Sequence, residues 1–238
     1  MSSETPNERA GTILLIGASR GLGLAMAADF LDRGWNVVGT VVGDDRTGLH
    51  DLADRSGGRL AIERVDITEP TQIAALRDRL AGHSFDILFC NAGTGNANAQ
   101  ETIGEVLTED FVRVMVTNAL GPMRVIEGLQ DLVPVDGLIG IMSSGQGSIS
   151  NNEKGGFEVY RGSKSALNQY MRCHAARHAG EARALVLMAP GWIRTALGGP
   201  NAPLSVEEAI PEVVDTLLAQ RGRPGLRYVD REGHTVPW

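Results

Sequence analysis

The sequence predicts an α/β fold with a single doubly wound Rossmann domain: a parallel sheet of about seven strands with helices on both faces. Short apolar runs alternate with longer segments whose apolar residues have helical spacing. The short runs are continuously apolar, which is typical of strands buried on both faces. Glycine makes up 30 of 238 residues, about 13% against an ordinary ~7%, so several turns need its backbone freedom. We expect one domain over 11–238 and a flexible tail over 1–10.

The elements of the first half follow one another as strand, helix, strand. The run 12–16 predicts the first strand, 22–33 a helix and 36–42 the second strand. A third strand is expected at 60–65 and a fourth at 86–90. Between these two, Ile73, Leu76 and Leu80 share one face of a helix over 70–80. Such alternation predicts right-handed crossovers between parallel strands.

The second half continues the alternation. Helical spacing extends from 108 to about 132, and Gly121 and Pro122 are expected to kink that helix. Ser205, followed three residues later by Glu208, predicts a capping box that opens a last helix, which Pro211 strains. The remaining elements are a strand at 137–142, a helix at 160–178, a strand at 183–188 and a short strand at 226–229.

The charge balance bears on partners and location. The chain has 29 acidic and 22 basic residues, a net charge of −7, and no cluster of Lys and Arg, so we expect neither nucleic acid nor a membrane surface as a partner. Its apolar runs fall far short of the ~20 residues of a membrane span. The first ten residues lack a signal-peptide pattern, which predicts a cytoplasmic protein. Cys90 and Cys173 are expected to be buried free thiols.

A glycine-rich turn follows the first strand. Residues 17–23, Gly-Ala-Ser-Arg-Gly-Leu-Gly, combine the spacing Gly-x-x-x-Gly-x-Gly with the start of a helix. Free N–H groups at a helix N-terminus, approached closely because side chains are absent, suit a pyrophosphate, so the turn predicts a dinucleotide site. Glycine also occurs in such turns for packing alone.

The choice of coenzyme depends on the end of the second strand. The nearest acids, Asp44 and Asp45, lie beyond Val42 and Gly43, whereas Arg20 stands inside the glycine turn, where its guanidinium could hold a 2′-phosphate. This pattern favours NADP(H) and leaves NAD(H) as the alternative.

A tyrosine and a lysine are placed for acid–base chemistry. Tyr160 and Lys164 are four residues apart, hence on one face of a helix, and a neighbouring ammonium is expected to lower the pKa of the phenol. The strand at 137–142 ends directly before Ser143 and Ser144. In an open parallel sheet, ligands bind beyond the carboxyl ends of the strands, where these hydroxyls would lie.

Taken together, these motifs resemble the short-chain dehydrogenase/reductase family over nearly the whole of 11–238. The residues that carry the resemblance are the glycine turn, Asn91-Ala92-Gly93, Asn118, Ser144, Tyr160 with Lys164, and Pro190-Gly191. The family more often has asparagine where this chain has Cys90. The segments 147–149, 198–208 and 236–238 look most like carbonyl reductases of the sniffer and C-factor type, although members often carry arginine directly after the second strand.

The resemblance implies a role for each matching residue. Ser144 would hydrogen-bond the substrate oxygen, Tyr160 would donate the proton, and Lys164 would hold the nicotinamide ribose. Asn118 would keep a water behind the lysine. The implied coenzyme contacts are Gly17, Ser19, Arg20, Gly21, Leu22, Gly23, Asp66, Ile67, Asn91, Ala92, Gly93, Tyr160, Lys164, Pro190, Gly191, Ile193 and Thr195.

The function expected from the resemblance is an NADP(H)-dependent interconversion of a small-molecule carbonyl and an alcohol. Two alternatives stay open, an NAD-dependent alcohol dehydrogenase and a dinucleotide-binding signalling or sensor protein of the C-factor type. The family also implies a homodimer or homotetramer formed through the long helices. Substrate specificity would come from loops near 94–102, 150–159 and 197–204, with Trp192 as a pocket candidate.

One further pattern concerns metal binding. His174 and His178 have helical i,i+4 spacing, which could in principle hold zinc. No third or fourth ligand is evident nearby in the sequence, so we predict no metal site.

Overall fold

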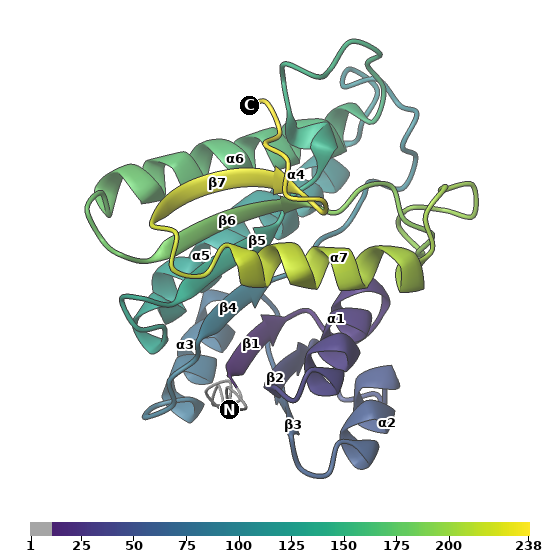
Figure 1. Ribbon diagram of the computed structural model, residues 1–238. Helices are drawn as coiled ribbons and strands as arrows, with labels where there is room; N and C mark the ends of the chain where they lie inside the picture. The colour runs from purple at the N-terminus through teal and green to yellow at the C-terminus, as the bar shows by residue number, and fades with distance from the viewer. Residues whose placement is uncertain (1–10) are drawn as a thin grey trace, which may run out of the picture.

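The computed structural model describes residues 11–238, and the tail expected at 1–10 lies outside the described residues. Seven parallel strands form one sheet in the order β3-β2-β1-β4-β5-β6-β7 (Figure 1). All seven predicted strands are confirmed to within one residue at each end. Their bounds are β1 Thr12–Ile16, β2 Asn36–Val41, β3 Leu60–Arg64, β4 Ile87–Cys90, β5 Leu138–Met142, β6 Ala184–Ala189 and β7 Gly225–Asp230.

Helices cover both faces of the sheet, α1, α2 and α7 on one side and α3 to α6 on the other (Figure 1). Their bounds are α1 Gly21–Asp32, α2 Gly48–Arg55, α3 Pro70–Arg79, α4 Thr108–Met115, α5 Gly121–Leu129, α6 Glu158–Arg177 and α7 Val206–Ala219. The doubly wound α/β fold predicted from the sequence is therefore confirmed, and so is the capping box of Ser205 and Glu208 at the start of α7.

The sequence analysis missed α2. Leu49 is the one fully buried residue of this eight-residue helix, and Leu52 and Ala53, three and four residues further, are partly buried against the same cluster, so a short helical spacing was present in the sequence. A second signal was present: the Thr47 hydroxyl and the His50 side chain form a reciprocal cap at its N-terminus. The cap and the short apolar face together specify this helix.

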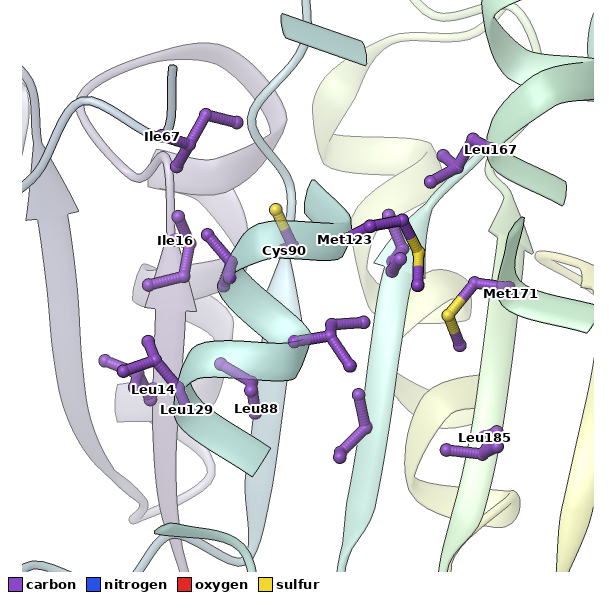
Figure 2. Close-up of a cluster of buried hydrophobic side chains, with 14 of the residues drawn as sticks. Leu14, Ile16, Ile67, Leu88, Cys90, Met123, Leu129, Leu167, Met171 and Leu185 are labelled. Carbon is purple, nitrogen blue, oxygen red and sulfur yellow. The ribbon is translucent and has the colours of Figure 1, made fainter. Parts of the chain in front are cut away.

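Two hydrophobic clusters fill the space between the sheet and the two helical layers. Figure 2 shows part of the cluster between the sheet and the helices α3, α5 and α6, to which Leu88 and Cys90 of β4, Met123 of α5 and Met171 of α6 belong. Burial raises the pKa of the Cys90 thiol to about 12, so this cysteine is inert core. Cys173 is also a free thiol but is exposed, so the expectation that both cysteines are buried is wrong for Cys173.

The long helix predicted from 108 to 132 is interrupted by a π turn at Val116–Leu120, between α4 and α5. The sequence predicts a disturbance at Gly121 and Pro122, and the structure places it in the turn before them. Pro122 has no N–H to donate to the carbonyl of Asn118, and Gly121 donates instead to Val116, five residues back. The π turn contains Asn118, whose side chain is fully buried.

None of the helices within residues 11–238 combines the length and the apolar character needed to cross a membrane.

Candidate active site

The turn between β1 and α1 requires glycine at three positions. Gly17 and Gly21 have positive φ angles of 83° and 57°. A Cβ at Gly17 would lie 2.9 Å from Ala92, and one at Gly23 would lie 2.1 Å from the carbonyl oxygen of Gly17. The Asn91 amide donates to that same carbonyl at 2.8 Å, so the turn after β4 holds the turn after β1 in place.

The N-terminus of α1 is built to receive an anion. Arg20 is its N-cap residue and no side chain caps this end, as is also true of α3, α4 and α6. Its uncapped N–H groups and the positive end of the helix dipole point beyond the carboxyl end of β1. The strand order reverses between β1 and β4, which is where open α/β sheets bind ligands. The residues present, including Ser19, Gly21, Leu22 and Gly23, therefore fit a dinucleotide pyrophosphate.

Three arginines stand near the end of β2. Arg20 is exposed at the glycine turn. Arg46 forms ion pairs with Asp51 and Asp54 of α2, and Arg64 forms one with Asp44. The sequence analysis missed Arg64, which lies opposite Val41 in the register of β2 and β3. That placement depends on strand pairing, which the sequence does not display.

Asp66 and Ile67 follow β3. The Asp66 carboxylate accepts from the N–H and the hydroxyl of Thr68, at 2.9 and 2.8 Å through one oxygen. The Ile67 side chain belongs to the hydrophobic cluster of Figure 2. Any contact of Ile67 with a ligand must therefore come from its main chain.

Ser144, Tyr160 and Lys164 come together beyond the carboxyl end of β5. The Ser144 hydroxyl accepts from the N–H of Gln146 at 3.2 Å and lies near enough to the Tyr160 phenol to lower its pKa. One turn along α6 from Tyr160, the Lys164 ammonium lies 5.8 Å from the centre of the phenol ring. A hydroxyl, a phenol and an amine thus share one site.

Lys164 is almost fully buried, and its amine donates to the carbonyl of Met142 at 2.8 Å. Burial lowers the pKa of Lys164 from 10.5 to about 8. A Cβ placed on Gly93 would lie 3.5 Å from the lysine nitrogen and 3.5 Å from Oδ1 of Asn118. The turn after β4 therefore brings a backbone without side chain against both groups.

The prediction that Lys164 lowers the pKa of Tyr160 is wrong for this state of the protein. Burial of the phenol raises the pKa of Tyr160, and the nearby Ser144 hydroxyl offsets only part of that rise. The ammonium is aimed at the Met142 carbonyl instead of the phenol oxygen. Tyr160 is accordingly a protonated phenol at neutral pH.

Asn118 holds three segments of the site together. Its side chain accepts from the N–H of Thr94 and donates to the Thr94 carbonyl, both at 2.7 Å, and donates to the Ser163 hydroxyl at 3.0 Å. The Asn118 side chain is thus used to dock the loop after β4 against α6. This leaves its main chain as the part that could hold a water.

The segment after β6 closes the site. Pro190 leads into Gly191 with a φ of 94°, and Ile193 is buried and bridges to Leu204. The Thr195 hydroxyl accepts from the N–H of Gly198 at 3.0 Å. Trp192 is 56% exposed and donates to the Gly198 carbonyl at 2.7 Å.

Tyr228 of β7 is a supporting residue that the sequence analysis did not identify. Its buried hydroxyl donates to the main-chain carbonyl of Ser144, and its ring lies 5.4 Å from that of Trp238. Burial raises the pKa of Tyr228 to about 12, so it stays a donor. Ser144 is therefore positioned from β7 as well as from its own strand.

Comparison with known proteins agrees with this geometry. A family model described as enoyl-(acyl carrier protein) reductase matches residues 17–217. A Burkholderia multivorans structure described as a short-chain dehydrogenase/reductase with bound NADP is 64% identical, with a TM-score of 0.95 over 97% of this chain and 100% of that one. A carbonyl reductase from Pseudomonas aeruginosa PAO1 in complex with NADP is 32% identical, with a TM-score of 0.89 over 97% of this chain and 100% of that one.

A curated relative of a different description also matches. The C-signal protein of Myxococcus xanthus is 32% identical over 155 residues, which are 64% of this chain and 92% of that protein. With a family match over residues 17–217, the sheet order and the Ser144, Tyr160 and Lys164 constellation, the chain belongs to the short-chain dehydrogenase/reductase family and is an oxidoreductase.

Proposed function

We propose that this protein is an NADP(H)-dependent oxidoreductase that interconverts a carbonyl and an alcohol, with Tyr160 as the acid and base. The observation that carries the proposal is the meeting of Ser144, Tyr160 and Lys164 beside an uncapped helix N-terminus. The coenzyme, when bound, supplies hydride from its nicotinamide ring.

The residues of the chain divide the remaining work. Ser144 donates a hydrogen bond to the substrate oxygen and polarises it, and Tyr160 delivers the proton to that oxygen. Lys164 binds the nicotinamide ribose, and Asn118 keeps a water behind the lysine. Proton transfer by a positioned side chain typically contributes about 10²- to 10⁴-fold to the rate.

The protonation state of Tyr160 favours reduction. Carbonyl reduction needs the phenol as a proton donor, and alcohol oxidation needs the phenolate as a base. An ordinary tyrosine is already protonated at neutral pH, and burial raises the pKa of Tyr160 further, so the phenolate forms only at a higher pH. We infer that the enzyme works as a reductase near neutrality and that oxidation requires a higher pH.

A direct test is to follow oxidation of NADPH and, in parallel, NADH at roughly 340 nm, the absorbance of reduced nicotinamide. Aldehydes, ketones, diketones and quinones would be offered as substrates. We expect turnover with NADPH on at least one carbonyl class. Turnover with NADH alone would replace the proposal with the NAD-dependent alternative.

The proposed 2′-phosphate site joins Arg20 with Arg64, and the NADP of the two solved relatives supports it. Arg64 also neutralises Asp44, the acid nearest to the end of β2. Arg20→Ala is expected to raise the Kd for NADPH about tenfold or more and to leave the Kd for NADH nearly unchanged, since hydrogen bonds to a charged group contribute about 1.5–3 kcal/mol.

Fluorescence titration with both coenzymes measures these constants. Arg55→Ala is the matched control, because Arg55 lies at the C-terminal end of α2 and donates to the Asp51 carbonyl. Equal weakening of NADPH and NADH by Arg20→Ala would contradict the assignment.

The relative named C-signal favours a second candidate function, a dinucleotide-binding signalling protein. In that case NADPH would change association with another protein, and turnover would be dispensable. Pulldown with and without NADPH, using wild type and a Tyr160→Phe variant, separates the two functions. A coenzyme-dependent partner that the variant retains would support signalling.

We also infer self-association through the long helices, as the family implies. Large apolar side chains are exposed on and next to the helices α4 and α6, at Leu107, Phe111, Val112, Leu120 and Tyr170. Exposed apolar residues on neighbouring helices suit an interface with a second copy. Sedimentation velocity should show a homodimer or homotetramer, and location in the cytoplasm stays a prediction of the sequence.

A further inference from the structure

Three potential metal ligands meet at the C-terminal end of α6. One donor atom from each of Glu127, His174 and His178 lies within 4.8 Å of the other two. Nδ1 of His174 is 3.3 Å from Oε1 of Glu127, and the two imidazole rings are centred 4.4 Å apart. His174 is fourteen residues beyond Tyr160 on one helix, roughly 20 Å along its axis, so this cluster is separate from the active site.

The cluster supplies the ligand that the sequence did not reveal. Glu127 comes from α5 and is 47 residues away from His174 in the chain. Two histidines at i,i+4 with one glutamate form a ligand set that holds zinc in proteins. For zinc bonds of about 2.0–2.1 Å in a tetrahedron, neighbouring ligand atoms lie ~3.3 Å apart, which matches the separation between Glu127 and His174.

Both imidazoles are prepared as ligands. His174 is buried, and its Nδ1 faces Oε1 of Glu127. Nδ1 of His178 lies 2.7 Å from a carboxylate oxygen of Glu181. Histidines that bind metals commonly have such a carboxylate on the other ring nitrogen, where it fixes the tautomer and the ring orientation.

A cavity of about 430 Å³ lies beside the cluster. His174, His178, Glu181 and Arg183 are among its lining residues. The Arg183 guanidinium lies 3.7 Å from a carboxylate oxygen of Glu181, so both a cation and a carboxylate belong to the lining. There is room here for a water or a small anion on an open coordination position.

We propose that Glu127, His174 and His178 bind one zinc ion, whose fourth position faces this cavity. The ion would join α5 to α6, the helix that carries Tyr160 and Lys164, and would stabilise the folded protein by binding it in preference to the unfolded chain. The proposal is independent of the function proposed for the active site.

Arg177 gives the proposal its sharpest test. Its guanidinium pairs with Oε1 of Glu127, the oxygen that also faces His174, and so competes with a cation for that carboxylate. Arg177→Ala should therefore tighten zinc binding. If the cluster were only a structural hydrogen-bond network, this variant would leave zinc affinity unchanged.

The experiment is isothermal titration of the chelator-treated full chain with Zn²⁺, together with the visible spectrum of the Co²⁺-loaded protein, which reports coordination geometry. We expect one zinc per chain and a thermal midpoint that rises with zinc. His178→Gln and Glu127→Gln should each weaken zinc binding at least tenfold, because each removes a ligand. Both side chains are partly exposed, so neither substitution should disturb the core.

His234→Gln is the matched control. His234 lies with Asp230 and Glu232 in an exposed turn, the other group of potential ligands within residues 11–238. Its substitution should leave zinc affinity and the cobalt spectrum unchanged. Absence of stoichiometric binding, unchanged affinity in His178→Gln and Glu127→Gln, or loss of binding in His234→Gln would each overturn the proposal.

Discussion

Tyr160→Phe is expected to lower kcat by about 10²- to 10⁴-fold while leaving the Kd for NADPH close to that of wild type. The substitution removes one hydroxyl from a partly buried ring and keeps the ring itself. What is lost is the proton donor and its interaction with Ser144. Stopped-flow measurement of NADPH oxidation, with fluorescence titration of NADPH, separates the chemical step from binding.

Tyr170→Phe provides the control for this prediction. Tyr170 is on the same helix, ten residues further, and its side chain is 46% exposed. The control should keep wild-type kcat and Kd. Retention of wild-type kcat in Tyr160→Phe would contradict the proposed acid, and loss of coenzyme binding in it would show that the ring positions the coenzyme instead.

The sheet could be predicted from the sequence because β1, β4, β5 and β6 are buried on both faces and so are continuously apolar, whereas β3 and β7 at the edges are partly exposed and give shorter apolar runs. Residues 184–189 of β6, for example, are all buried. The helix α2 was missed because its apolar face is only three residues long, Leu49, Leu52 and Ala53, and two of these are only partly buried. The π turn was predicted only as a disturbance, since Pro122 forbids one hydrogen bond without specifying how the chain replaces it.

The site was predictable where spacing along one element places the groups, as with Tyr160 and Lys164 on α6. Contacts between distant elements were not. Arg64 reaches the end of β2 only through strand register, and Tyr228 reaches Ser144 from another strand. The pKa of Tyr160 was misjudged for a related reason, because spacing shows that a lysine is near but not that its amine points to Met142.

Lys164→Met is expected to abolish most activity and, at the same time, to change how stability depends on pH. Methionine keeps an unbranched apolar chain in the buried position and removes the charge that would bind the nicotinamide ribose. Coenzyme affinity and kcat should both fall, which distinguishes this variant from Tyr160→Phe. Any stability that the variant gains by removing a buried charge is partly offset, because the Met142 carbonyl loses its hydrogen-bond donor.

The pH dependence isolates the effect of the buried charge. The unfolded lysine keeps its proton up to pH 10.5, whereas the folded protein releases it above about 8. Between these values the unfolded state binds more protons, so the free energy of unfolding of the wild type rises with pH. The difference between 10.5 and about 8 corresponds to roughly 3 kcal/mol.

Denaturant unfolding of both proteins at about pH 7.5, 9 and 10.5 measures this term. Wild type should gain stability relative to Lys164→Met by roughly 3 kcal/mol across the series, because the other titrating groups are common to both chains and cancel in the difference. A constant difference would mean that Lys164 keeps an ordinary pKa in the folded state. A second group, besides the Met142 carbonyl, would then have to stabilise the buried ammonium and hold it at the active site.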